Sequence, residues 1–455
     1  MNPLLETSKI RFLPGKIKLY ARALVDGVGT EADYDGVLQY ISRESVSLAF
    51  IHYTLPDIAN FDPTTASLGF RSLKVLLKPR VFSAFEDASD ELWPGAWRWM
   101  LFISTFGSTI PGLGQYLDLD NDIFVTSVLV STKFHRLYEA SGPLLAGCET
   151  PEAVYIFTRG WTLLSRASRD YVEAMECIQM VLSKNRLEDN PDRIPSLVEG
   201  AHGPAGLATL FIDTLRAFLL DLRRAPGEWP VMRENLSLVQ MMRHAEPGLL
   251  SSDPSDHRLV RKPSAFMQAL ISGGAIELLS EAALFYFAIA GGSGAAHGAL
   301  ALIAHLITFP NGYFRARLTG ATLVRAVIGL VTTLPSAKLV APVAAESASA
   351  LAEFYFVHIL PVMIGDDAFM RDARLAMGPD DEGSFVLSSD EPSAGPGINK
   401  LIKEESFKSW CSEHPGVWEP LFARMKENLW AKASSRIISR QPCSRHMVWI
   451  VSIPL

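Results

Sequence analysis

The chain has 455 residues, of which 48% are apolar, and its mean hydropathy is +0.17, so it can bury a large core in two or three domains or in one long stack of repeats. A net charge of −7 and an isoelectric point near 5.9 argue against nucleic acid as the main partner, because phosphate binding needs a sustained cationic surface. The four cysteines are spread over about 300 residues, unlike the dense framework of a small secreted domain, and they favour a reducing compartment.

The N-terminus, MNPLLETSKIRFLPG, lacks the apolar stretch of a signal peptide. Glu6 also stands where an early positive charge is expected. Secretion is therefore not expected. Together with the cysteine usage, this predicts a cytoplasmic or nuclear protein.

Apolar residues recur at three-to-four spacing along nearly the whole chain, whereas alternating patterns bounded by hairpin dipeptides are hard to find. The sequence therefore predicts an all-α fold. Loops rich in proline and glycine separate the helical segments. They fall at 61–65, 106–115, 187–196, 223–230, 251–264 and 309–312. These breaks delimit helical hairpins more than domains.

Two clusters in the first third of the chain have features of binding sites. LWPGAWRWM places Trp93, Trp97 and Trp99 close together, either as a recognition platform or as core packing, and core packing is the favoured interpretation. LDLDND begins with the spacing of a calcium loop in Asp118, Asp120 and Asp122. The loop then lacks its glycine and its last glutamate, so we expect these acids to cap the helix that follows.

No charged residue lies between Glu281 and Arg315, and this apolar run allows three interpretations. As a membrane span it would need about 20 continuous apolar helical residues. The glycines of GGSG at 291–294 instead divide it into segments near 278–290 and 295–308, and each is too short to span. His297 and His305 weaken the span further, so a membrane association is not expected.

The second interpretation is a nucleotide-binding turn formed by Gly292, Gly294 and Gly298 in GSGAAHG. Glycines there would let backbone N–H groups approach a pyrophosphate at a helix N-terminus. The acid that binds ribose about 20 residues downstream is missing, and no series of strand–helix units surrounds the motif. Arg315 and Arg317 could serve a 2′-phosphate, so a nucleotide-dependent enzyme stays an alternative.

The third and favoured interpretation is a pair of buried helices within a stack of helical hairpins. The pattern of ISGGAIELLSEAAL at 271–284 returns loosely as LTGATLVRAVIGLV at 318–331, with Gly274 matched by Gly320. A separation of 46 residues is the period of armadillo or HEAT units. We therefore predict an irregular helical-hairpin solenoid over 1–377, with a possible sub-boundary near 187–196.

An acidic, polar segment at 378–397 is predicted to be a solvated linker, followed by a short helical region and tail at 398–455. Just before it, Asp366, Asp367 and Asp372 approach the aspartate-rich magnesium motif of all-α terpene synthases. The third acid lies too far away and no second metal motif follows. Helix capping explains these acids equally well.

The C-terminal region contains two Cys-x-x-His pairs, which are Cys411 with His414 and Cys443 with His446. Together they could form a tetrahedral zinc site. No glycine knuckles flank them, and the residues between the pairs look helical, so unrelated surface residues are the competing interpretation. No His-Glu-x-x-His helix, nucleophile elbow or Walker loop occurs in the sequence, and no cofactor is expected.

The segment GVWEPLFARMKENLWAKAS at 416–434, preceded by helical repeats, resembles a group of uncharacterised fungal proteins. In these an armadillo-like helical body precedes a C-terminal MYND zinc finger. The finger is missing here, because Cys443 alone stands where several Cys-x-x-Cys pairs should follow. The resemblance therefore implies no zinc ligand. It implies a helical body that binds a protein or peptide partner.

These observations together predict an intracellular, non-catalytic scaffold of helical repeats that binds a protein or peptide. A nucleotide-dependent enzyme using the loop from Gly292 to Gly298 is the first alternative, and a membrane-associated helical protein is the second.

Overall fold

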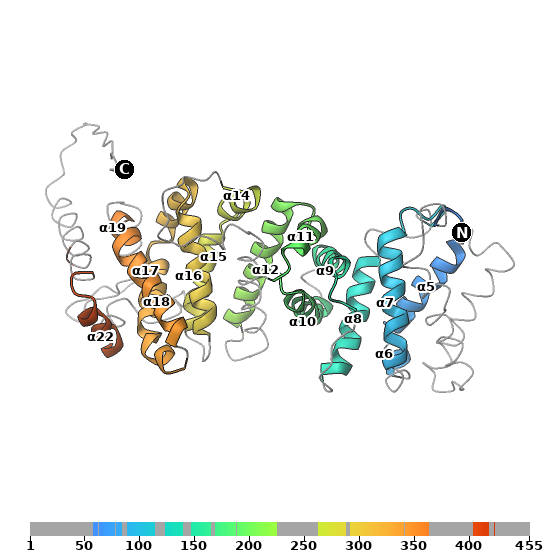
Figure 1. Ribbon diagram of the computed structural model, residues 1–455, viewed down its shortest axis with the longest axis horizontal. Helices are drawn as coiled ribbons and strands as arrows, with labels where there is room; N and C mark the ends of the chain where they lie inside the picture. The colour runs from blue at the N-terminus through green and yellow to red at the C-terminus, as the bar shows by residue number, and fades with distance from the viewer. Residues whose placement is uncertain are drawn as a thin grey trace. The chain divides into compact units, whose positions relative to one another are not determined.

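In the computed structural model, 84% of the described residues lie in helices and none in strands, which confirms the all-α prediction for this part of the chain (Figure 1). The described residues are 58–61, 63–77, 79–83, 89–113, 123–139, 147–164, 169–187, 189–224, 263–287, 292–340, 342–363, 404–417 and 423. Those up to Gly273 belong to one compact unit, unit 1, and those from Gly274 on belong to a second, unit 2. Segment 187–196 lies inside unit 1.

The helices of unit 1 follow one another closely along the chain. They are α5 (Pro63–Leu76), α6 (Pro79–Ser83), α7 (Ser89–Phe106), α8 (Phe124–Glu139), α9 (Pro151–Leu163), α10 (Arg169–Lys184), the 3₁₀ turn η4 (Pro191–Arg193), α11 (Ile194–Gly200), α12 (Pro204–Arg224) and α14 (Ala265–Ser272). α8 packs against α9 and α10, α9 against α11, and α12 against α14. Trp161, Phe211 and Phe266 meet edge to face in the core, with centroids 5.7 and 6.0 Å apart.

Two glycines let the central helices of unit 1 approach one another closely. At Gly160 of α9, a Cβ atom would lie 2.9 Å from the Phe124 carbonyl oxygen. At Gly200 of α11, a Cβ atom would lie 2.9 Å from the Tyr155 carbonyl oxygen of α9. Any side chain at either position would push neighbouring helices apart, so glycine is what permits this packing.

Unit 2 is built around the packing of α15 on α16 and α17, and of α17 on α18 and α22. Its elements are α15 (Ala275–Phe287), α16 (Ser293–Ile307), α17 (Pro310–Val340), α18 (Pro342–Phe354), the π-helical turn η6 (Tyr355–Ile359), α19 (Leu360–Met363) and α22 (Glu405–Glu413). The buried Tyr355 hydroxyl donates to the Leu300 carbonyl at 2.7 Å. This bond ties the π-helical turn to α16.

The glycines that match in the sequence 46 residues apart lie at two breaks in the helices. Gly274 separates α14 from α15 and has a φ of +86°, a conformation that glycine adopts without strain. Gly320 lies where α17 bends by 85° between Thr319 and Thr322. The helices after these breaks correspond as well: α15 and the second part of α17 begin 47 residues apart, and α16 and α18 begin 49 apart.

Within the described residues, no single helix is both long and apolar enough to cross a membrane. Three pairs of successive segments, each interrupted by a short break, pass that test of length and composition when they are taken together. They are Pro191–Gly200 with Pro204–Leu220, Ala265–Ser272 with Ala275–Phe287, and Pro310–Thr319 with Thr322–Leu334.

Candidate protein-binding surface

The predicted nucleotide loop forms the start of α16. Gly292 is the buried N-cap residue, and a Cβ there would collide with the Tyr286 carbonyl oxygen. Gly294 is exposed, with no atom within 4 Å of its Cβ position, and Gly298 is buried inside the helix. Helix α15 precedes the loop, so the strand of a dinucleotide-binding unit is not there. Packing accounts for Gly292, and nucleotide binding stays a prediction.

One of the two predicted zinc pairs lies on α22. Cys411 is half-buried in the helix, and His414 is its C-cap residue, stacked on Trp410 with ring centroids 4.4 Å apart. The His414 Nδ1 lies 2.9 Å from the Trp410 carbonyl oxygen, so Nδ1–H donates there if that nitrogen carries the proton. The residues Cys443 and His446 lie outside the described part of the chain, and the zinc site stays a prediction. Among the residues that the structure describes, no group of three or more potential metal ligands occurs.

The three clustered tryptophans form part of the core of unit 1. Trp93, Trp97 and Trp99 are 2%, 4% and 1% exposed, and the Trp93 and Trp97 rings stack 5.7 Å apart. The Trp97 indole also donates to the Gly147 carbonyl at 3.1 Å. Core packing is confirmed, because rings this buried offer no platform. The two groups of aspartates, at 118–122 and 366–372, lie outside the described residues.

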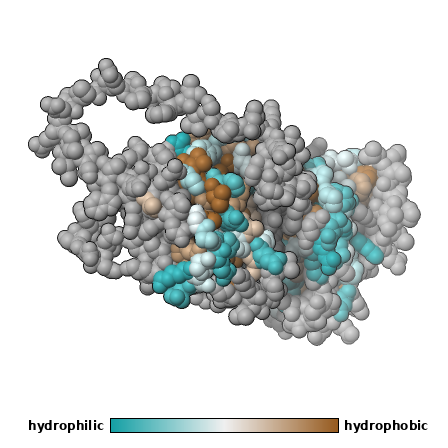
Figure 2. Space-filling view, turned by 60° about the vertical axis from the view of Figure 1, so that its left-hand side comes forward, coloured by the Kyte–Doolittle hydropathy of each residue, from teal (hydrophilic) through white to brown (hydrophobic). Residues whose placement is uncertain are grey.

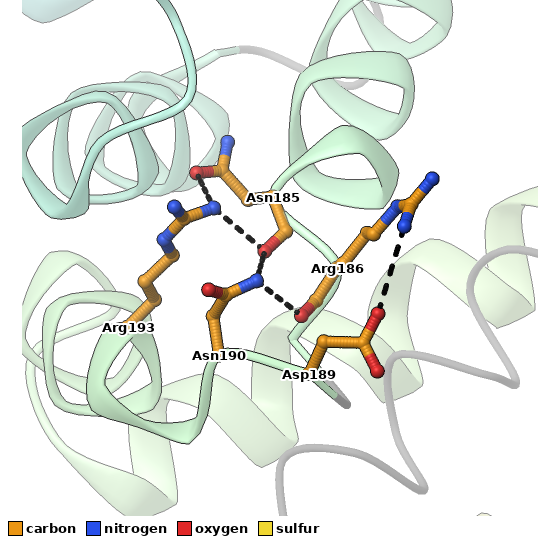
Figure 3. Close-up of polar contacts among 5 residues, drawn as sticks. All are labelled: Asn185, Arg186, Asp189, Asn190 and Arg193. Carbon is orange, nitrogen blue, oxygen red and sulfur yellow. Dashed lines mark hydrogen bonds and ion pairs between the residues drawn. The ribbon is translucent and has the colours of Figure 1, made fainter.

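A network of polar side chains lies at the end of α10 and was not predicted from the sequence (Figure 3). The fully buried Asn185 amide donates to the Cys148 and Val181 carbonyls at 2.9 and 2.8 Å. Its own carbonyl and Oδ1 accept from Arg193 at 2.8 and 2.9 Å. Asn190 donates to the Asn185 carbonyl at 3.1 Å. These bonds satisfy the last carbonyls of the helix, which makes the network a structural cap.

Two buried cysteines lie in unit 1 and are poor nucleophiles. Burial raises the pKa of Cys177 to about 12, although the Thr132 hydroxyl bonded to it opposes this shift. Burial also raises the pKa of the Cys148 thiol, and the nearby Cys177 adds to the effect. Reactive cysteines need a stabilised thiolate and access to solvent. Neither is provided here, so these thiols serve as packing groups.

Among the described residues, the two most exposed large apolar side chains are Phe314 and Leu318, on the first part of α17. With the partly exposed Tyr313 and Arg317 they form a cluster that we call the α17 patch. Phe314 is 59% exposed and Leu318 is 60% exposed, one turn apart. The Arg317 guanidinium carbon lies 5.5 Å from the centre of the Phe314 ring and 5.9 Å from that of Tyr313. Burial raises the pKa of Tyr313 despite the opposing charge of Arg317, so its phenol stays neutral.

The opposite side of the same helical segment is held against the body of unit 2. Ala316 is fully buried and Thr319 nearly so. Arg315 forms an ion pair with Glu277 of α15 at 3.1 Å, with both side chains partly exposed. These contacts fix how the segment is rotated. They therefore fix the α17 patch on the solvent side.

A second apolar area lies at the π-helical turn and α19. Val357 is 44% exposed and Val362 is 58% exposed. Figure 2 turns this end of unit 2 forward and shows hydrophobic residues in a strip bordered by hydrophilic ones. A π-helical turn widens the helix by one residue and rotates the side chains that follow, and such turns are frequent at functional sites.

Comparison of the chain with protein-family models, curated proteins and solved structures found no match. Any function of the exposed surface therefore has to follow from the chemistry of its own residues. Among these, the exposed aromatic, arginine and leucine side chains of the α17 patch are the groups suited to contact another protein. The exposure of Phe314 and Leu318 could not be predicted from the sequence, because apolar residues at helical spacing give the same pattern whether they are buried or exposed.

Proposed function

We propose that the protein is a non-catalytic scaffold of armadillo- or HEAT-like helical repeats that binds a protein or peptide partner. The recurrence of helices at intervals of 47 and 49 residues in unit 2 supports this proposal. Armadillo and HEAT units repeat at about 40–47 residues, and each unit buries its apolar face against the next. In this proposal, the breaks at Gly274 and Gly320 occupy the same position in two successive repeats. No cofactor is required.

The single observation that carries the binding function is the α17 patch. Tyrosine and arginine carry much of the binding energy at interfaces, usually within an apolar surround. Burying a phenylalanine or leucine side chain contributes about 1.5–3 kcal/mol. Phe314 and Leu318 therefore contribute part of the binding free energy of a contact, and the charge of Arg317 favours an acidic or aromatic counterpart. A cytoplasmic or nuclear location is part of the proposal, and the unpaired thiols of Cys148 and Cys177 accord with it.

Site-specific photo-crosslinking in the full-length chain tests this proposal. A photoreactive amino acid replaces Leu318, and a matched control replaces Thr209, an exposed residue of α12 in unit 1. We expect a discrete protein adduct from position 318 in cells and none from position 209. Excess wild-type chain should compete the adduct away, whereas a competitor carrying Phe314→Ala and Leu318→Ala should not.

Equal adducts from both positions would mean non-specific contact and would reject the α17 patch as the binding site. Competition by the double variant would reject it too, because that competitor lacks both anchors. The competitor's circular dichroism should match that of the wild type, since both substituted side chains are more than half exposed.

A further inference from the structure

Helix α22 packs on the rest of unit 2 with two buried aromatic side chains. Phe407 and Trp410, three residues apart on one face, are 1% and 3% exposed. Both rings meet Phe356 of the π-helical turn, with centroids 6.4 and 5.2 Å apart. The Trp410 indole also donates to the Ser349 hydroxyl of α18 at 3.3 Å. The backbone of α22 lies against α17.

The rest of α22 gives it little stability of its own. It has nine residues, and isolated helices shorter than about 12–15 residues are marginal in water. Its N-cap residue, Glu404, makes no capping side-chain hydrogen bond. Lys408 forms its ion pair with Glu405 inside the same helix, exposed to solvent. Docking on the rest of unit 2, with the aromatic pair as its buried part, therefore stabilises the helical form of this segment.

The residue that lies under both aromatic rings of α22 is itself apolar. Phe356 is 1% exposed while α22 is in place. Departure of α22 would uncover its ring. The result is an apolar surface with one hydrogen-bonding hydroxyl, Ser349, at its edge. Helix-binding grooves combine an apolar floor with anchors at i and i+3 or i+4 in this way.

We propose that α17, α18 and the π-helical turn form a groove, the α22 groove, that takes an amphipathic helix from a protein partner. That helix presents two aromatic side chains three residues apart, one of them an indole that reaches Ser349. Helix α22 is the internal occupant and exchanges with the partner's helix. The side chains that meet the aromatic pair, Phe356 and Ser349, do not belong to the α17 patch.

Fluorescence anisotropy with a labelled peptide tests the exchange. The peptide covers residues 404–414 and carries Cys411→Ser to avoid oxidation. It is titrated with full-length wild type and with the full-length double variant Phe407→Ala, Trp410→Ala. An occupant on the same chain competes with the free peptide, so we expect the double variant to bind the peptide about tenfold more tightly or better. A peptide in which both aromatics are alanine should not bind.

Absence of binding to the double variant, or equal binding of the alanine peptide, would overturn the proposal. Adding Phe356→Ala to the double variant should abolish binding because it removes the floor of the groove. The wild type offers a second measurement that needs no variant. Excess peptide should speed hydrogen exchange in α22 but not in α16, and unchanged exchange would count against displacement. Concentration-dependent dimerisation of the wild type would assign the groove to a second copy of this chain instead.

Discussion

At the scale of single residues, the fully buried Asn185 joins the end of α10 to the Cys148 carbonyl and to Arg193. Its replacement by alanine leaves the Cys148 carbonyl without its amide donor and removes one acceptor of Arg193. An unsatisfied buried polar group costs about 1–3 kcal/mol, so we expect Asn185→Ala to lower the free energy of unfolding by about 2–3 kcal/mol. Urea denaturation followed by circular dichroism measures this loss.

Asn190 provides the matched control, because its amide donates to carbonyls of the same turn from a partly exposed position. Water can replace those bonds. Asn190→Ala should therefore cost less than about 1 kcal/mol. An equal loss of unfolding free energy in the two variants would show that the burial of Asn185 adds nothing to the stability its hydrogen bonds provide.

The cysteines should differ sharply in reactivity. A pKa of about 12 leaves about one Cys177 thiol in 10⁵ ionised at neutral pH, and burial protects it further. Cys148 is similarly buried, whereas Cys411 is half-buried on α22. Of these three described cysteines, iodoacetamide should therefore modify Cys411 first in the native protein, and Cys148 and Cys177 only after denaturation. Peptide mass spectrometry reads the order, and early native labelling of Cys148 would contradict it.

His305, in the last turn of α16, should make stability depend on pH. Burial lowers its pKa from the ordinary value of 6.5 in the folded state. Between the folded and unfolded pKa values, the unfolded chain binds more protons, so stability falls as the pH drops below about 6.5. His305→Gln should flatten this part of the pH profile. Urea midpoints at about pH 7.5 and about pH 5.5 for both proteins test it, and parallel profiles would refute the assignment.

At the scale of helices, glycines decide how closely neighbours pack. Gly160→Ala places a methyl group against Val128 and 2.9 Å from the Phe124 carbonyl oxygen, so we expect a loss of about 1–3 kcal/mol. Gly294→Ala is the matched control in the first turn of α16, where no atom lies within 4 Å. It should raise stability by about 0.4–1 kcal/mol. Thermal melting distinguishes the two, and a destabilising Gly294→Ala would point to a role beyond packing.

Helix boundaries could be predicted well where glycine and proline interrupt the pattern. The segments expected near 278–290 and 295–308 are α15 and α16, displaced by no more than three residues. Glycine is needed at position 292 between them, because a Cβ atom there would collide with the Tyr286 carbonyl oxygen. The π-helical turn at 355–359 could not be predicted, because one extra residue per turn depends on contacts such as that of Tyr355 with Leu300.

The exposed surface was also beyond sequence reasoning. Phe314 and Leu318 repeat at helical spacing, as do the buried Leu323 and Val327 later in α17. Only the bend between Thr319 and Thr322 and the ion pair of Arg315 with Glu277 turn the first pair outward. Such contacts depend on residues almost 40 positions apart, which a local pattern does not contain.

At the scale of the whole molecule, each of the two units has its own buried core. In unit 1 the Thr214 hydroxyl accepts from the Trp161 indole at 3.1 Å and is fully buried. In unit 2 the equally buried Tyr355 hydroxyl donates to the Leu300 carbonyl. Because each unit has its own buried core, we expect the two to open as separate cooperative parts.

Two variants of the full chain test this independence by hydrogen exchange. Thr214→Val leaves the Trp161 indole unsatisfied, so exchange should accelerate in α9, α10 and α12 while α15–α18 stay protected. Tyr355→Phe removes the bond to Leu300, so exchange should accelerate in α16 and α18 alone. Each variant removes one hydrogen bond in the core of one unit, so its effect on exchange should stay within that unit. Acceleration across both units in either variant would instead require that the two open as a single cooperative body, and would reject their independence.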